Sequence, residues 1–128
     1  MELEAWRTAL VREIERAAEW RAEKAVADPE DTRLADSQQA LFNLAEQVKA
    51  LPPDHAELSA LHKEETELGE LQRATAGEPE ARYHDAKEDL LGAYGIDHPP
   101  FDTVEGFLKV LRNRVDETIS EYRLRACA

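Results

Sequence analysis

The chain has 128 residues, of which 42% are hydrophobic and 34% charged, and its formal net charge is −12. This length and composition exclude a disordered chain and predict one soluble globular domain over residues 1–128. A single cysteine, Cys127, excludes an internal disulfide, and no window has the apolar length of a membrane span. We therefore expect a cytoplasmic protein with no membrane contact.

The negative charge is concentrated in the middle of the sequence. Residues 54–97 contain 12 acidic and 4 basic residues, whereas residues 99–128 contain 5 of each. A negative field repels nucleic acid, because phosphate binding depends on clusters of Lys and Arg. We expect no nucleic-acid partner. The charge would attract a basic protein, or it serves only to keep the chain soluble.

The first half of the chain predicts two helices, because apolar residues recur there at three- and four-residue spacings. The first helix runs from Glu2 to about Ala27, and the second extends to about Ala50, with Asp28 as its N-cap and Pro29 as its first residue. A short connection makes the two helices an antiparallel hairpin. In that register three apolar pairs lie level: Leu10 with Val48, Ile14 with Leu44, and Ala17 with Leu41.

The second half of the chain predicts three more helices. They cover about residues 54–76, 79–94 and 102–122. Asp54 is expected to cap the third helix with Glu57 as its capping-box partner, and Asp102 or Thr103 to cap the last. No segment resembles a strand. The predicted fold is therefore all-α: an antiparallel bundle of four to five helices, built from two αα-hairpins and a C-terminal helix that closes the core.

Two Asp-His pairs are candidate metal ligands. Asp54-His55 precedes the third predicted helix and Asp97-His98 follows the fourth, so an antiparallel hairpin would bring both pairs to the same end of the bundle. A transition-metal ion could bind the two imidazoles and one or both carboxylates. This is the small-molecule site that the sequence favours.

A second set of histidines and carboxylates lies within the helices. His62 and Glu65 are neighbours on one helical face, as are His84 and Glu88 on the next helix. Ferritin-like di-iron bundles use such residues, but the hairpin register separates His62 from His84 by roughly 15 Å along the axis. We therefore expect no internal metal and no cofactor. Glu65 is expected to form an ion pair with an arginine at the core margin, or to be solvated.

The segment His84-Asp85-Ala86-Lys87 resembles the His-x-x-Lys core of histidine-phosphotransfer domains, which are acidic helical bundles. The resemblance covers four residues and implies that His84 accepts a phosphoryl group while Lys87 stabilises its charge. Glu88 stands where that family has a glycine, and its carboxylate would repel the phosphate.

The two tryptophans have different positions on the first predicted helix. Trp6 lies in the apolar stripe and is expected in the core, whereas Trp20 lies at the edge of the stripe. The neighbours of Trp20 are basic: Arg16, Arg21 and Lys24. Tryptophan and arginine are enriched in binding hot spots, so these four residues are a candidate interface, in a homodimer or with another protein. The alternative is a contact between Trp20 and the last helix.

No catalytic residues are predicted, because the chain lacks a Ser-His-Asp set, a Gly-rich phosphate loop, a Cys-x-x-Cys pair and an HExxH motif. The favoured function is a non-catalytic interaction or adaptor module that binds another protein or itself. Two alternatives stay open. One is a metal-binding or histidine-phosphotransfer bundle, and the other is an acidic decoy that occupies a nucleic-acid-binding groove.

Overall fold

A computed structural model describes residues 2–75, 79–93 and 103–127. Within these residues there is no strand, and the chain forms five helices: α1 (Leu3–Ala27), α2 (Thr32–Ala50), α3 (Ala56–Thr75), α4 (Pro79–Ala93) and α5 (Val104–Cys127). The prediction of an all-α bundle is confirmed, and the predicted helices agree with the observed ones to within a few residues.

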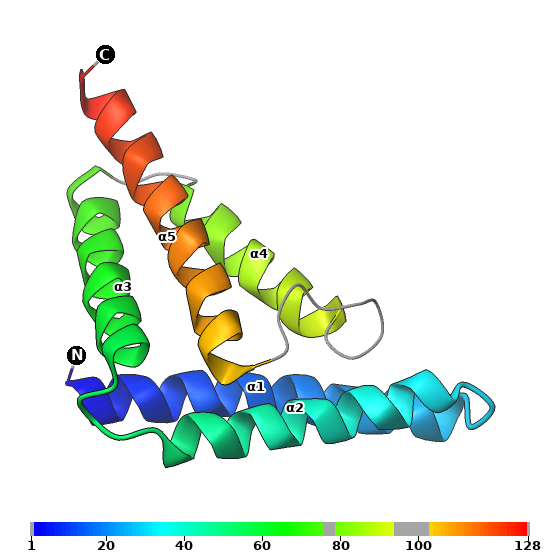
Figure 1. Cartoon of the computed structure of the whole chain (residues 1–128). Coiled ribbons are helices and arrows are strands. Elements are labelled where there is room, and N and C mark those ends of the chain that lie inside the picture. Colours follow the sequence, from blue (N-terminus) through cyan, green and yellow to red (C-terminus); the bar gives the residue numbers. More distant parts are fainter. Residues whose placement is uncertain (1, 76–78, 94–102, 128) are drawn as a thin grey trace.

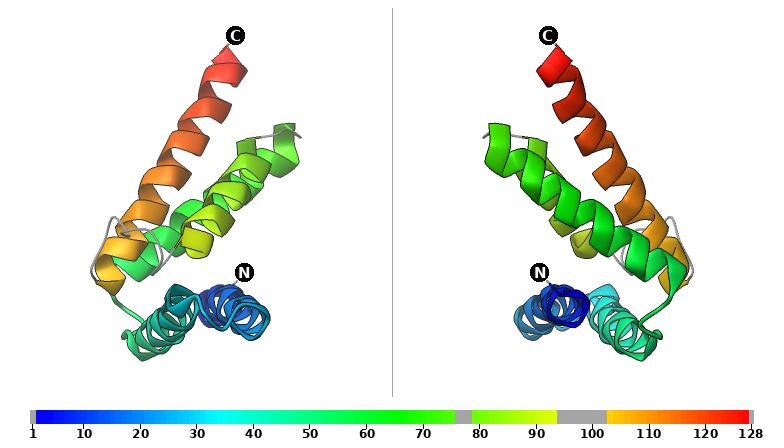
Figure 2. Two further views of the ribbon diagram at one scale, coloured as in Figure 1. Left: turned by 90° about the vertical axis from the view of Figure 1, so that its right-hand side faces the viewer. Right: turned by 90° about the vertical axis from the view of Figure 1, so that its left-hand side faces the viewer.

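The helices form two layers (Figure 1). The hairpin of α1 and α2 lies across the base, and α3, α4 and α5 rise from it. Both α3 and α4 pack more extensively on α5 than on each other. The side views show α5 leaning away from α3 and α4 as it leaves the hairpin (Figure 2). The last helix thus closes the core, as predicted, and it does so as the shared neighbour of α3 and α4.

The N-cap predicted for α2 is wrong by three residues. The backbone N–H of Asp28 donates to the Lys24 carbonyl at 2.9 Å, so Asp28 ends α1. The cap of α2 is Asp31, whose carboxylate accepts hydrogen bonds from the backbone N–H of Arg33 at 3.1 Å and from its guanidinium at 3.0 Å. Both aspartates are good capping residues, and the one that also binds a neighbouring arginine begins the helix.

The cap predicted for α3 is wrong by one residue. Asp54 is exposed, whereas Nδ1 of His55 accepts a hydrogen bond from the backbone N–H of Leu58 at 3.3 Å. The carbonyl of His55 also accepts the first helical hydrogen bond, from Ser59 at 2.9 Å. Glu57, the expected capping-box partner, binds an arginine of α5 instead.

The buried side chain of Arg7 fixes the register of the α1–α2 hairpin. Its Nη1 donates to the carbonyls of Val48 at 3.4 Å and Lys49 at 3.3 Å, and it also donates to Leu51. These carbonyls lie at the end of a helix, where the regular helical hydrogen bonds stop, and a cation there complements the helix dipole. Arg7 therefore lies level with the end of α2, in agreement with the predicted register.

One hydrophobic cluster joins all five helices, and Trp6 belongs to it as predicted. The largest fully buried aliphatic and aromatic side chains come mainly from α2, α3 and α5: Leu41, Leu44, Val48, Leu58, Leu61, Leu68, Phe107, Leu108, Leu111 and Val115, with Ile14 from α1 and Tyr83 from α4. The middle of α5 is thus enclosed by the other helices.

We predict that Leu111→Ala lowers the free energy of unfolding by about 2 to 5 kcal/mol, because Leu111 is fully buried in this cluster. Urea denaturation followed by circular dichroism measures the change. Asn113→Ala, at an exposed position of the same helix, is the matched control and should change stability by less than about 0.5 kcal/mol. Equal effects of the two substitutions would contradict the packing of α5.

Candidate functional site

A groove of about 1000 Å³ lies between α1 and α4. Its walls come from one face of each helix, because the lining residues recur at three- and four-residue spacings. We call it the α1–α4 groove and define it by its lining residues: Glu13, Arg16, Ala17, Trp20 and Arg21 from α1, and His84, Lys87, Glu88, Asp89, Leu91 and Gly92 from α4. Its volume is at the upper end of the range of ordinary ligand sites, roughly 300–1000 Å³.

Trp20 lines the α1–α4 groove with 48% of its surface exposed. Two cations lie over its indole ring: the guanidinium carbon of Arg21 and the ammonium nitrogen of Lys24, each 4.8 Å from the ring centroid. These contacts hold the ring in place by cation–π attraction. Arg16 also lines the groove. Three of the four residues predicted as an interface therefore line the groove, and the fourth, Lys24, contacts the Trp20 ring.

Arg21 differs from the sequence expectation because it is buried, with 8% of its surface exposed. Its Nε atom has no hydrogen-bond partner, and no described carboxylate lies within ion-pair distance of its guanidinium. Burial lowers the pKa of Arg21 below its usual value. Across the groove, a side-chain carbon at Gly92 would lie 3.6 Å from the Arg21 Nη2 atom, an ordinary van der Waals distance, so the guanidinium packs against this part of α4.

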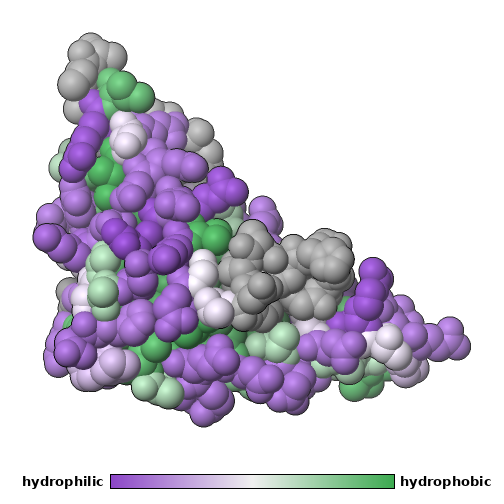
Figure 3. Space-filling view, in the orientation of Figure 1, coloured by the Kyte–Doolittle hydropathy of each residue, from purple (hydrophilic) through white to green (hydrophobic). Residues whose placement is uncertain are grey.

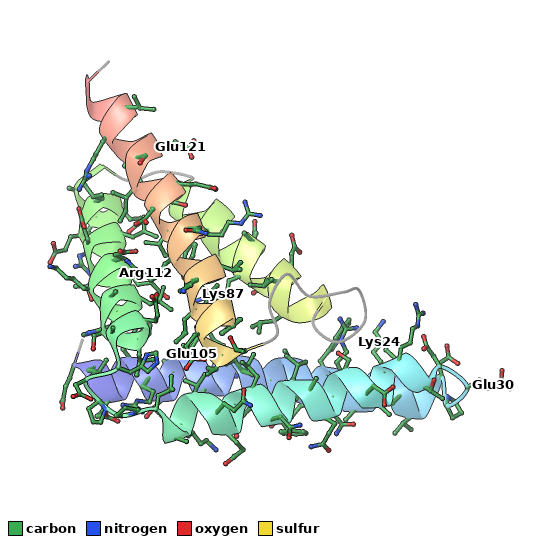
Figure 4. All side chains as sticks on the ribbon, in the orientation of Figure 1. Lys24, Glu30, Lys87, Glu105, Arg112 and Glu121 are labelled. Carbon is green, nitrogen blue, oxygen red and sulfur yellow. The ribbon has the colours of Figure 1, made fainter. Side chains whose placement is uncertain are left out.

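Lys87 is the second buried cation of the groove, with 4% of its surface exposed. Its ammonium lies 3.1 Å from the carboxylate of Glu13 on α1 and 3.8 Å from that of Glu65 on α3. The Tyr83 hydroxyl donates to Glu65 at 2.9 Å, and the Tyr83 ring lies 5.3 Å from the ammonium. The four residues form a polar cluster that connects three helices. Figure 4 labels Lys87 within it.

The polar cluster explains one difference from the sequence analysis and one shifted pKa. Glu65 was expected beside an arginine, and its partners are Lys87 and Tyr83. Burial, followed by the negative charge of Glu65, raises the pKa of the Tyr83 hydroxyl far above its usual value.

The geometry around His84 gives little support to phosphotransfer. The His84 side chain is exposed at the groove and packs against the Tyr83 ring, with 5.5 Å between ring centroids. Its implied partner Lys87 is buried and already bound to two carboxylates. A buried, neutralised ammonium would contribute little to a phosphate on an exposed imidazole.

The predicted metal ligands are only partly within the described residues. His55 uses Nδ1 as the α3 cap, and its Nε2 lies 3.5 Å from Glu105 at the start of α5. Asp54 is exposed, and Asp97 and His98 lie outside the described residues. Among residues 2–75, 79–93 and 103–127, no three His, Cys, Asp or Glu side chains are grouped closely enough to hold a metal ion. His62 instead packs against Trp6, with 5.3 Å between ring centroids.

The acidic face of α3 is bound to α5, a contact that the sequence analysis missed. Arg112 of α5, which Figure 4 labels, binds Glu57 at 2.8 Å and Glu64 at 3.1 Å, and Arg123 binds Glu67. The hydrogen bonds that Arg112 donates to Glu57 and Glu64 raise the pKa of Arg112, while burial raises the pKa of Glu64. The seven-residue spacing of Glu57 and Glu64, two helical turns, was the available sequence signal.

Comparison with known protein families, with curated proteins and with solved structures gives no match to this chain. The function must therefore be argued from the site itself.

The surface of the molecule is mostly polar. The face visible in Figure 3 is mainly hydrophilic, with smaller apolar areas between the hydrophilic ones. None of the described helices is both long and apolar enough to cross a membrane.

We predict that Tyr83→Phe changes the alkaline part of the stability curve. The folded pKa of Tyr83 is raised, so the folded state keeps this proton above pH 10, where the unfolded chain, with a tyrosine pKa of about 10, loses it. The free energy of unfolding of the wild type should therefore fall by up to about 1.4 kcal/mol per pH unit above pH 10 because of this group. The variant lacks the hydroxyl, so its free energy of unfolding should not show this fall. Urea denaturation between pH 9 and pH 11 measures both slopes, and parallel slopes would contradict the prediction.

Proposed function

We propose that the protein is a non-catalytic interaction module that binds a segment of another protein in the α1–α4 groove. The single observation that supports this is the half-exposed indole of Trp20, held by cations beside a groove of about 1000 Å³. Large aromatic side chains left exposed beside a groove are typical of binding surfaces. The lining combines apolar and charged side chains, as protein interfaces do.

The contacts of Trp20 favour binding over a chance exposure. Arg21 and Lys24, each 4.8 Å from the ring centroid, restrict the ring before any partner arrives. A side chain that is already restrained loses less conformational entropy on association. Val26 and Leu124 are more exposed, at 83% and 73%, but neither lines the groove. Of these three exposed apolar side chains, Trp20 is therefore the one placed to anchor a partner in the groove.

The acidic-decoy alternative is less favoured by the α3–α5 contacts. Glu57 and Glu64 are engaged by Arg112, and Glu67 is engaged by Arg123. A decoy needs its carboxylates free to imitate phosphates. On α3 these three carboxylates instead serve the fold.

We predict that Trp20→Ala weakens partner binding by about thirtyfold or more, the loss expected when a hot spot worth ~2 kcal/mol is removed. Affinity capture from the native host, with each captured protein quantified by mass spectrometry, measures the change. Val26→Ala is the matched control, because it removes an exposed apolar side chain of the same helix outside the groove. The helicity of both variants should equal that of the wild type.

Three outcomes separate the possibilities. Proteins captured by the wild type and Val26→Ala but lost with Trp20→Ala support the proposal. Capture that is equal in all three proteins contradicts it. If Trp20→Ala instead halves the mass found by sedimentation, the bound segment belongs to a second copy of the chain, and the module is a homodimer.

A further inference from the structure

We infer that the partner segment presents a carboxylate to Arg21 in the α1–α4 groove. The inference rests on the proposed function and adds the chemistry of the bound group. Its basis is a positive charge that the described fold buries without an anionic partner, at the site where Trp20 is exposed.

The burial of Arg21 is the first step. Arginines are rarely buried unless they are paired, because removing a guanidinium from water is costly without a compensating anion. The other buried arginine, Arg7, binds three backbone carbonyls and Glu4. The Nε atoms of both arginines are shielded from water and unpaired, so the difference is that the Arg21 guanidinium has no carbonyl or carboxylate partner among the described residues. An anion that enters the groove would supply the missing partner.

The carboxylates already in the groove do not fill this role. Glu13 is bound to Lys87, and Glu88 and Asp89 are exposed on α4. No ion pair joins any of the three to Arg21, and burial is the cause of the lowered pKa of its guanidinium. The α1 side of the groove therefore keeps two cations, Arg16 and Arg21, for a ligand.

The groove fits a carboxylate better than a phosphate. A guanidinium binds a carboxylate with two parallel hydrogen bonds, so a single arginine is sufficient for a single negative charge. A phosphate carries more charge and would be repelled by Glu88, Asp89 and the chain's net charge of −12. Ala17, Trp20 and Leu91 offer apolar surface to neighbouring side chains of a peptide. The carboxylate could come from an Asp or Glu side chain or from a free C-terminus.

The test is a titration of ¹⁵N-labelled protein followed by NMR at the Arg21 Nε–H group. Because this Nε is buried, its proton should exchange slowly enough with water to be observed, and its signal is assigned by its loss in Arg21→Met. Four probes are compared: acetyl-Leu-Leu with a free carboxylate, acetyl-Leu-Leu-amide, acetyl-Leu-Glu-Leu-amide and inorganic phosphate. We expect a carboxylate probe to shift the Arg21 and Trp20 side-chain signals and to bind at least tenfold more tightly than the neutral amide or phosphate.

Three variants test the role of the arginine. Arg21→Met should weaken the best carboxylate probe at least tenfold, as read from the Trp20 indole signal. Arg21→Lys keeps the positive charge but cannot form the bidentate pair of hydrogen bonds with a carboxylate, so it should bind the probe with intermediate affinity. Arg12→Met is the matched control, because Arg12 is an exposed arginine of α1 outside the groove. Arg21→Met should remain folded, since it removes a buried charge that has no described partner.

The outcomes are distinct. Tighter binding of the free C-terminus identifies a chain end as the ligand, and tighter binding of the Glu peptide identifies an internal acidic residue. Equal binding of carboxylate and amide probes, tighter binding of phosphate, or no effect of Arg21→Met overturns the inference. An Arg21 signal that moves in Asp97→Asn without any probe also overturns it, because the chain would then supply its own carboxylate. These results leave the proposed function standing if partner capture still depends on Trp20.

Discussion

The position of α4 depends on one buried ammonium group. Lys87 lies in a nearly water-free environment and needs negative partners, which it finds on two different helices, Glu13 of α1 and Glu65 of α3. A cation of this kind is destabilising unless both carboxylates approach it, so the polar cluster determines where α4 can lie relative to α1 and α3. The α1–α4 groove exists because α4 is held in that place. The shape of the site and the stability of the fold thus share a cause.

Basic side chains also fix the other contacts between helices. Arg7 ends α2 by binding its last carbonyls, and Arg112 joins α5 to two carboxylates of α3. In each case a long basic side chain of one helix completes groups that its neighbour leaves unsatisfied. Apolar burial supplies most of the stability, but these polar contacts decide the register and orientation of each helix. Arg21 is the exception, because the described residues give it no anion.

The sequence predicted the helices and most of the core, because the spacing of apolar residues is a local signal. It predicted the helix starts less well. Two neighbouring residues could each be the N-cap, Asp28 or Asp31 for α2 and Asp54 or His55 for α3, and the choice depends on side-chain contacts that the spacing of apolar residues does not show. The sequence also placed Trp20 and its three cations on one edge of α1. The burial of Arg21 had a local signal, because this residue continues the apolar stripe of α1 beyond Ile14 and Ala17. The burial of Lys87 could not be predicted, since its stem is long and flexible and its exposure depends on the angle at which α4 approaches α1.

The contacts of α5 have a kinetic consequence. The hairpin of α1 and α2 contains its own closing contact, between Arg7 and the end of α2, so its register is set within the first 51 residues. The helices α1 and α2 can also pair outward from their short connection at residues 28–31, whereas α3 meets its main neighbour α5 only after the whole of α4. Contacts between distant parts of a chain form slowly, since the intervening loop must be ordered first. We therefore expect the docking of α5 to be the slow step of folding. In that case, weakening the contact between α3 and α5 should lower the folding rate.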